Sequence, residues 1–332
     1  EAMQAISMRV ILSAVFGLAA GPRYQQLEHL LTTMLNETSN PVSVSLLYFP
    51  ILRQDLGSRS PWGNFIRRRQ QIDQIIYDEI AERQATPDSP RSDILSLLMS
   101  ARDEAGEPMT DVELRDELMT LLFAGHETTA TALSWALYWI HKLPDVREQL
   151  LQELQELDDP LEPTASLRLP YLNAVCCETL RIYPVGMLTF PRIVRSPVEL
   201  MGQQLEPGTV VVGSIYLTHH REDLYPDPDQ FKPERFLERQ FSPFEYLPFG
   251  GGSRRCIGMA FAQFEMKLVL SRILSQVELT LADTSPARPV RRGLTSGISP
   301  VQLIVQRYSP ESPVTQARQT QDDPIEEPSL KA

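Results

Sequence analysis

The stretch from Phe249 to Gly258 reads FGGGSRRCIG, and the helix-forming run MAFAQFEMKLVLSRIL follows it. Its three consecutive glycines allow positive φ angles and a close approach of the backbone to a neighbour. Cys256 stands where this loop gives way to a helix, and the free N–H groups of a helix N-terminus favour an anion there. We therefore expect a thiolate that acts as a nucleophile or as a metal ligand.

Several kinds of site could use such a cysteine. A structural cysteine in an ordinary loop is the simplest. A phosphate-binding loop would need a Lys after the glycines, and a zinc site would need further Cys or His ligands close by. A catalytic cysteine needs a histidine base, which the sequence alone does not place. An iron–sulfur cluster takes about four cysteines, whereas haem ligation needs one, and the chain has 3.

Composition indicates a globular protein outside the nucleic-acid-binding classes. The chain has 332 residues, 42% of them hydrophobic, and a net charge of −12, which argues against nucleic acid as the main partner. The sparse cysteines suit a reducing compartment, so we expect the cytoplasm, with a membrane anchor ahead of residue 2 as an open alternative. The apolar stretches 5–20 and 119–140 contain charged residues, which favours buried helices over membrane spans.

Helical periodicity dominates the first two thirds of the chain and predicts helices over residues 2–17, 22–35, 62–84, 110–143, 144–157 and 170–183. The longest of these would extend about 50 Å at roughly 1.5 Å per residue. The apolar segment 42–57 predicts either a loop packed on the core or a mobile lid over an apolar cavity. Residues 194–212 predict small antiparallel hairpins, 298–308 a last strand and 309–332 a disordered tail.

The middle of the longest predicted helix reads AGHETT over residues 124–129. A glycine inside a helix costs about 1 kcal/mol relative to alanine, so it indicates a local defect. One use for such a defect is to admit a flat ligand or O2 close to the backbone. Glu127 beside Thr128 could then form a proton relay. The alternative is an exposed polar helix face.

Glu178 and Arg181 are spaced i, i+3 within an apolar helix, and Arg235 in FKPERF is a candidate third member. Burying the pair would require further hydrogen bonds to offset desolvation. Taken alone, the Glu-x-x-Arg spacing favours a surface salt bridge.

The segments AGHETT, ETLR, FKPERF and FGGGSRRCIG occur in this order at wide spacings. Together they resemble the cytochrome P450 superfamily of haem-thiolate monooxygenases, over residues 2–308. The family pattern F-x-x-G-x-R-x-C-x-G is matched by Phe249, Gly252, Arg254, Cys256 and Gly258. The resemblance implies a mainly α fold with a minor β part: a long central helix across the haem, small antiparallel sheets, one domain over 1–308 and a tail over 309–332.

The resemblance also assigns roles to single residues. Cys256 would be the axial thiolate of a haem b iron, and Glu127 and Thr128 would deliver protons. Glu178, Arg181 and Arg235 would form a buried structural triad. Arg254 and Arg192 would pair with the haem propionates, and the remaining expected cofactor contacts are Phe249, Gly250, Gly258 and Ala124. Substrate-pocket candidates, each of which could equally be ordinary core, are Phe123, Val185, Gly186, Met187, Leu188 and Ser296.

By the same resemblance, the protein would be a bacterial monomer that inserts one oxygen atom of O2 into an apolar small molecule, such as a fatty acid, alkane, terpenoid or steroid-like compound. A separate ferredoxin or flavodoxin/reductase-type protein would supply electrons and dock near Arg254, Arg255 and Lys267. The alternatives are a peroxygenase or isomerase-type haem-thiolate enzyme, or a non-catalytic haem- or ligand-binding fragment. The family's usual N-terminal region has no counterpart before residue 2, so we expect a partial domain that binds haem poorly.

Overall fold

The computed structural model describes residues 1–17, 21–38, 49, 53–57, 60–86, 91–157, 164–292 and 295–308. They form two compact units. The first comprises residues 1–131 and 290–297, and the second comprises residues 132–289 and those from 298 onward. The predicted tail 309–332 lies outside the described residues, as does most of the segment 42–57 that we interpreted as a loop or lid.

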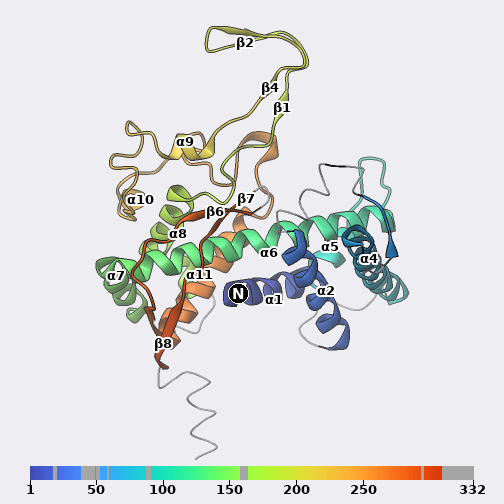
Figure 1. The fold of residues 1–332 in the computed structure, drawn as a ribbon, viewed down its shortest axis with the longest axis horizontal. Helices are drawn as coiled ribbons and strands as arrows, with labels where there is room; N and C mark the ends of the chain where they lie inside the picture. Colours follow the sequence, from blue (N-terminus) through green and yellow to red (C-terminus); the bar gives the residue numbers. More distant parts are fainter. Residues whose placement is uncertain are drawn as a thin grey trace, which may run out of the picture. The chain divides into compact units, whose positions relative to one another are not determined.

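Helices build the first unit (Figure 1). They are α1 (Ala2–Phe16), α2 (Pro22–Thr38), α4 (Pro61–Ala85), α5 (Ile94–Ser100) and the first part of α6 (Asp111–Lys142). Apolar residues recur along them at every third or fourth position and form the core, including Met8, Leu12, Val15, Leu27, Leu31, Ile72 and Ile76. The spacing of these residues gives each helix one apolar face, which is why the helices pack.

Side chains at the helix starts satisfy backbone N–H groups that have no partner within the helix. The Ser60 hydroxyl accepts from the N–H of Gly63 at the start of α4 (3.2 Å). At the start of α6, the N–H of Thr110 donates to the Glu113 carboxylate (2.8 Å), and the N–H of Glu113 donates to the Thr110 hydroxyl (3.3 Å). The reciprocal pair confirms the predicted start of the longest helix.

The second unit contains the rest of α6 together with α7 (Pro144–Gln155), the short 3₁₀ helix η3 (Ala165–Arg168), α8 (Pro170–Ile182), α9 (Ile215–His219), α10 (Arg235–Glu238), the 3₁₀ turn η4 (Gly252–Arg254) and α11 (Met259–Gln276). Helix α8 lies at its centre, in contact with α7, α9, α10 and α11. Nearly all of its side chains are buried. An aromatic cluster closes the core beside it: Trp135, Tyr138, Trp139, Tyr183 and Phe231.

The strands form two-stranded sheets. Antiparallel pairs join β1 (Arg192–Ile193) to β4 (Val210–Val211), β2 (Val198–Leu200) to β3 (Gln203–Leu205), and β5 (Val277–Leu281) to β8 (Leu303–Tyr308); β6 (Pro289–Arg292) pairs with β7 (Thr295–Ile298). The hairpins predicted over 194–212 are therefore confirmed. The single strand predicted over 298–308 is wrong at its start: Ile298 ends β7 and β8 begins at Leu303. Pro300 lies between them and has no N–H to give to a ladder.

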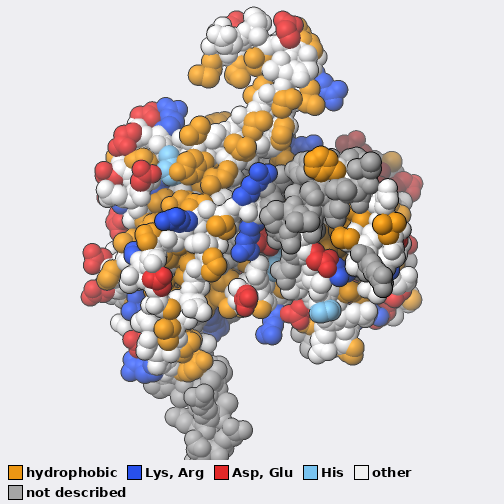
Figure 2. All heavy atoms as spheres, viewed as in Figure 1, with side chains coloured by type: hydrophobic (Ala, Val, Ile, Leu, Met, Phe, Trp, Pro, Cys, Tyr) orange, Lys and Arg blue, Asp and Glu red, His pale blue; other side chains and the backbone are white. Residues whose placement is uncertain are grey.

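The ribbon of β1 and β4, continued by β2 and β3, extends from the rest of its unit (Figure 1). Its exposed surface is rich in apolar side chains (Figure 2), including Phe190, Ile193, Val198, Leu200, Met201, Val210 and Val212. Elsewhere the predicted helices are confirmed with small shifts of their ends. Among the described residues, no helix has the length and apolar character needed to cross a bilayer.

Candidate functional site

Two backbone hydrogen bonds fix the loop that carries Cys256. The N–H of Gly250 donates to the carbonyl of Leu247, and the N–H of Cys256 donates to the carbonyl of Phe249, each at 2.9 Å. Gly250 and Gly252 have φ angles of 70° and 64°, which side chains with a Cβ rarely adopt. The glycines therefore supply the left-handed turns that bring the two ends of the loop together.

The Cys256 thiol at the end of this loop is suited to bind a metal whose other ligands come from a cofactor. Cys256 is exposed, whereas Cys176 and Cys177 are buried. Beside it Ile257 is 92% exposed, and a Cβ added to Gly251 or Gly252 would meet no atom within 4 Å. No group of three Cys, His, Asp or Glu side chains in the described part of the chain could bind a metal by itself. One soft sulfur on an open, partly apolar surface would suit a haem iron, because the porphyrin nitrogens supply further ligands.

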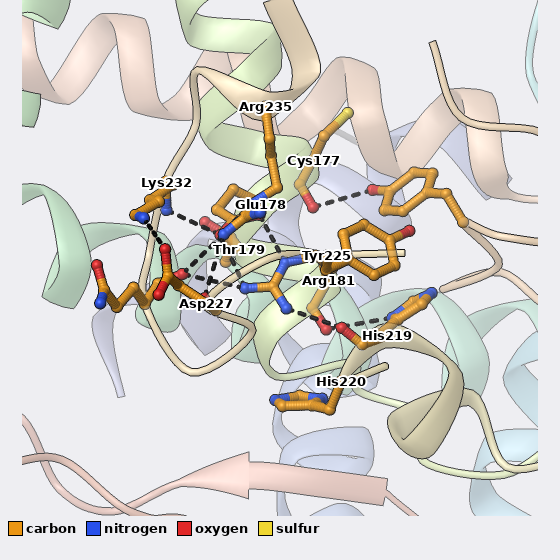
Figure 3. A network of polar contacts seen from close by, with 12 residues as sticks. Cys177, Glu178, Thr179, Arg181, His219, His220, Tyr225, Asp227, Lys232 and Arg235 are labelled. Carbon is orange, nitrogen blue, oxygen red and sulfur yellow. Dashed lines mark hydrogen bonds and ion pairs between the residues drawn. The ribbon is translucent and has the colours of Figure 1, made fainter. Parts of the chain in front are cut away.

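Glu178, Arg181 and Arg235 form one buried network in the second unit (Figure 3). Arg181 Nε lies 2.7 Å from Glu178 Oε2, and Arg181 Nη2 lies 2.8 Å from Glu178 Oε1. Arg235 Nε reaches the same Oε1 at 3.2 Å. Glu178 and Arg181 are both fully buried. The surface salt bridge favoured by the spacing alone is therefore wrong, and the geometry is the triad that the resemblance implies.

Backbone groups complete the network and offset the cost of burying its charges. The N–H of Lys232 donates to Glu178 Oε1 (2.8 Å), and Arg181 donates to the carbonyls of His219 (2.9 Å) and Gln230 (3.2 Å). The Arg181 guanidinium also lies 5.3 Å from the centre of the Tyr225 ring. A buried ion pair is tolerated when its remaining donors and acceptors are satisfied in this way.

The acid and the alcohol of α6 make separate contacts within the first unit. Glu127 Oε1 accepts from Arg292 Nη1 of β6 at 2.9 Å, and both side chains are partly exposed. The Thr128 hydroxyl donates to the carbonyl of Ala124 at 2.6 Å, one turn back in the helix. Arg292 lies across Gly297, where an added Cβ would come within 2.8 Å of its Cδ. Gly297 thus makes room for the arginine that holds Glu127.

Gly125 serves helix packing in this structure. A Cβ on it would lie 2.7 Å from Ile11 Cδ1 of α1, so the glycine lets α1 approach α6. The next residue faces the same way: His126 is buried, with Nε2 3.0 Å from the carbonyl oxygen of Gln4. Burial lowers the pKa of His126. The alternative of an exposed polar helix face therefore does not hold for His126.

The remaining predicted residues differ in exposure. In the first unit Phe123 is half-buried, Ala124 is exposed and Ser296 is buried. In the second unit Val185 is buried, Gly186 and Met187 are half-buried, and Leu188 is exposed and bridges to Ser214. Arg192, Arg254 and Arg255 are exposed, while Phe249, Gly250, Gly258 and Lys267 are half-buried.

Sequence reasoning missed two residues that contact the predicted ones. His219 accepts a hydrogen bond from the backbone of Leu247 and exchanges hydrogen bonds with Arg181. Arg292 holds Glu127. A histidine beside a second histidine and an arginine in a strand both look like surface residues. No short-range signal connects positions 38 or 165 residues apart.

Comparison with known proteins identifies the family. The profile of the family "Cytochrome P450" matches residues 1–305. The chain belongs to the cytochrome P450 family. It is 41% identical over 290 residues to "Putative cytochrome P450 135B1" of Mycobacterium tuberculosis, which covers 86% of this chain and 59% of that protein. It is 37% identical over 296 residues to "Putative cytochrome P450 135A1" of the same species, covering 89% and 62%. The chain thus spans about three fifths of the length of these relatives.

Solved P450 structures share the fold. "Retinoic acid bound cyanobacterial CYP120A1" aligns with a TM-score of 0.73 at 28% identity, over 91% of this chain and 68% of that one. The "cytochrome P450DA heme domain" aligns with a TM-score of 0.77 at 24% identity, over 93% and 68%. The mainly α fold with small antiparallel sheets is therefore the P450 fold, and the cofactor of this family is haem with a cysteine thiolate ligand.

Proposed function

We propose that this chain carries the thiolate ligand of a P450 monooxygenase that inserts one oxygen atom of O2 into an apolar small molecule. The observation that carries the proposal is the exposed Cys256 thiol on a glycine-turned loop held by two backbone hydrogen bonds. Family membership supports the reaction class. Because this chain spans 59% of the length of that curated relative, the activity is stated as a proposal.

The chain's own residues would hold the cofactor in stated ways. Cys256 would ligate the iron as a thiolate, and haem with this ligand supplies the activation of O2. Phe249 would pack against the ligand loop, whose backbone it already closes through its carbonyl. Arg254 and Arg192 are exposed and would be available to pair with propionate carboxylates.

Glu127 and Thr128 would move protons, with Arg292 governing where Glu127 lies. The hydroxyl of Thr128 is both donor and acceptor, so it can pass a proton while it is bonded to the Ala124 carbonyl. The Glu127 carboxylate is held by Arg292, and partial exposure leaves it accessible to water. Proton delivery would require the Glu127–Arg292 contact to open or shift.

For the substrate we propose an apolar small molecule. The similar cyanobacterial P450 has retinoic acid bound, an apolar chain with a carboxylate. Val185, Met187 and Leu188 contribute apolar side chains to the segment after α8, where the resemblance places pocket residues. A fatty acid, terpenoid, alkane or steroid-like compound would match such a lining.

The test is the carbon monoxide difference spectrum of the reduced chain, reconstituted with excess haem because the sequence leads us to expect weak haem binding. We expect the strongly red-shifted Soret band of thiolate ligation in the unchanged protein and in Cys176→Ser, because Cys176 is buried away from any ligand role. The band should be lost in Cys256→Ser. A red-shifted band that persists in Cys256→Ser, or that is absent from all three proteins, would contradict the proposal.

The electron donor would be a separate protein that docks at the exposed arginines near the ligand loop. Arg255 is the better probe, since Arg254 is expected to contact a propionate. We expect Arg255→Glu to slow reduction by a ferredoxin or flavodoxin-type donor and to weaken its salt dependence. Arg195→Glu, which reverses a charge on the exposed β ribbon, is the matched control. Equal reduction rates in the two variants would refute this docking site.

A further inference from the structure

His219, the last residue of α9, lies buried between α8 and the segment that leads to the ligand loop (Figure 3). Its backbone carbonyl accepts from Arg181 Nη1 at 2.9 Å. Its ring uses both nitrogens: Nδ1 lies 3.2 Å from the carbonyl oxygen of Arg181, and Nε2 accepts from the N–H of Leu247 at 3.0 Å. One histidine thus connects two segments that are 66 residues apart, 181 and 247, through three hydrogen bonds.

These partners determine the protonation of the ring. The N–H of Leu247 can only donate, so Nε2 carries no hydrogen. The carbonyl of Arg181 can only accept, so Nδ1 carries the hydrogen. The ring is therefore the neutral Nδ1–H tautomer. Burial acts in the same direction and lowers the pKa of His219 to about 3.

The segment that His219 holds is also anchored on either side of that bond. The Tyr225 hydroxyl donates to the carbonyl of Glu245 at 3.0 Å. The Tyr246 hydroxyl donates to the carbonyl of Cys177 at 3.1 Å, and its ring stacks on His219 with centroids 5.6 Å apart. The contact from His219 is the last of these before the chain turns into the glycine loop.

From Leu247 the hydrogen bonds continue directly to the cysteine. Its carbonyl accepts from Gly250, and two residues on the carbonyl of Phe249 accepts from Cys256. A displacement of Leu247 would therefore move both backbone bonds that close the loop. Arg181 is fixed by Glu178 on one side and meets His219 on the other.

Other roles for His219 do not fit its surroundings. Both ring nitrogens have partners, which leaves no lone pair for a metal. The ring is fully buried, so it cannot exchange protons with water. The neighbouring His220, the C-cap of α9, provides a contrast: its Nδ1 lies 2.9 Å from the carbonyl oxygen of Tyr216 in that helix, and its ring makes no hydrogen bond to the ligand-loop segment among the described residues.

We propose that His219 is a positioning residue for the ligand loop: its Nδ1–H tautomer couples the buried Arg181 to the backbone of Leu247 and so fixes the Phe249–Cys256 hydrogen bond. The meaning of this for haem rests on the proposed function of Cys256. The coupling itself is a property of the fold and is testable without haem.

Two substitutions separate the two ring nitrogens. The Asn side chain of His219→Asn reaches the position of Nδ1 and can still donate to Arg181, but it leaves the N–H of Leu247 without an acceptor. The longer side chain of His219→Gln reaches the position of Nε2 and can accept from Leu247. His220→Gln, at the C-cap of the same helix, is the matched control.

The readout is amide hydrogen exchange at Gly250 and Cys256 in the haem-free 332-residue chain, under conditions where urea titration shows each variant folded. We expect exchange at both amides to rise roughly tenfold in His219→Asn and to stay within about twofold of the unchanged protein in His219→Gln and His220→Gln. Equal rates in the Asn and Gln variants, whether both slow or both fast, would overturn the proposal. Failure of both variants to fold would also overturn it, because His219 would then be required for the folding of the whole second unit and not for the position of the loop alone.

Haem provides an independent second readout. In reconstituted protein the share of the thiolate-type carbon monoxide band should fall in His219→Asn and be retained in His219→Gln. If the unchanged protein shows no such band, the proposed function fails, while the exchange measurements still decide whether His219 positions the loop.

Discussion

A buried arginine joins distant segments in each unit, but the two arginines differ in what surrounds them. In the first unit Arg83 of α4 bonds Glu79, Asp93 and the carbonyl of Phe16, which ties α4 to the end of α1 and the start of α5. In the second unit Arg181 bonds Glu178 and the carbonyls of His219 and Gln230.

The difference lies in the partners of the central carboxylate. Glu79 is also reached by Arg23 at 2.5 Å and Arg91 at 3.3 Å, and both of those arginines are partly exposed. Among the described residues, the partners of Glu178 besides Arg181 are the buried Arg235 and the backbone N–H of Lys232. If the central carboxylate loses its buried arginine, water and the neighbouring arginines can therefore compensate far better in the first network than in the second.

The largest effect should follow Arg181→Ala. It leaves the Glu178 carboxylate buried with too few donors, and breaking such a pair costs about 3–5 kcal/mol. We expect the second unit to lose its cooperative urea transition, monitored by the fluorescence of the buried Trp135 and of Trp139, which packs against the same core cluster. A transition within about 1 kcal/mol of the unchanged protein would show that the network is not needed for stability.

Arg83→Ala should cost less, about 2–3 kcal/mol, because Arg23 and Arg91 remain beside Glu79. Trp62 of α4 reports on this unit. The double variant Arg83→Ala/Arg91→Ala removes one of the compensating cations, so the cost should then approach that of Arg181→Ala. Additive effects of the two substitutions would contradict compensation by Arg91.

As the pH falls, the two networks should lose their contributions to stability at different pH values. His219 has a pKa of about 3 in the fold, against 6.5 ordinarily, so the unfolded chain binds a proton that the folded one does not. Its stabilising contribution is complete above about pH 6.5 and falls with pH below that, by about 2 kcal/mol at pH 5. The urea midpoint of His219→Gln should therefore vary less between pH 7.5 and 5 than that of His220→Gln.

The first network should keep its contribution to stability down to a lower pH than the second. Burial opposes ionisation of Asp93, but the hydrogen bonds from Arg83 and from the N–H of Ser96 outweigh it and lower the pKa of Asp93 below 3.8. A carboxylate with a lowered pKa stabilises the fold above its unfolded pKa and loses that contribution as pH falls through its folded pKa. In Asp93→Asn, the pH dependence below about 4 should be reduced. If the free energy of unfolding of Asp93→Asn falls with pH in this range as steeply as that of the unchanged protein, groups other than Asp93 cause the acid destabilisation.

The smallest effect on stability should come from Arg292→Gln. The Glu127–Arg292 contact joins two partly exposed side chains, and such pairs contribute about 0–1 kcal/mol. We expect a urea midpoint close to that of the unchanged protein, together with a changed coupling of O2 consumption to product if Glu127 moves protons. A loss comparable to that of Arg83→Ala would place Arg292 among the structural arginines instead.

These contrasts also show what the sequence could predict. Glu178, Arg181 and Arg235 were found because their spacing matches a family pattern, and the spacing alone pointed to the surface. Arg83 is also buried, and its network was missed because Glu79 and Asp93 look like ordinary helix-surface and loop acids. Burial of a charge depends on which segments pack over it, and local periodicity carries no information about that.

The long helix α6 also shows that local features can be predicted and long-range contacts cannot. Its start was predicted at Thr110 because a capping box is a local feature with its own hydrogen bonds. The role of Gly125 was not predicted, because it depends on Ile11, 114 positions earlier. The hairpins over 194–212 were predicted from turn residues, whereas β5 pairs with β8 across more than twenty residues and gave no such signal.

The network around Glu178 also has a consequence for the order in which the protein is made. Lys232 and Arg235, which complete it, lie 54 and 57 residues further along the chain. During synthesis α8 therefore leaves the ribosome long before its carboxylate can be fully paired. The second unit can close only after residues 219–247 have followed, so that the slowest step of its folding should be the arrival of these distant partners rather than the formation of any one helix.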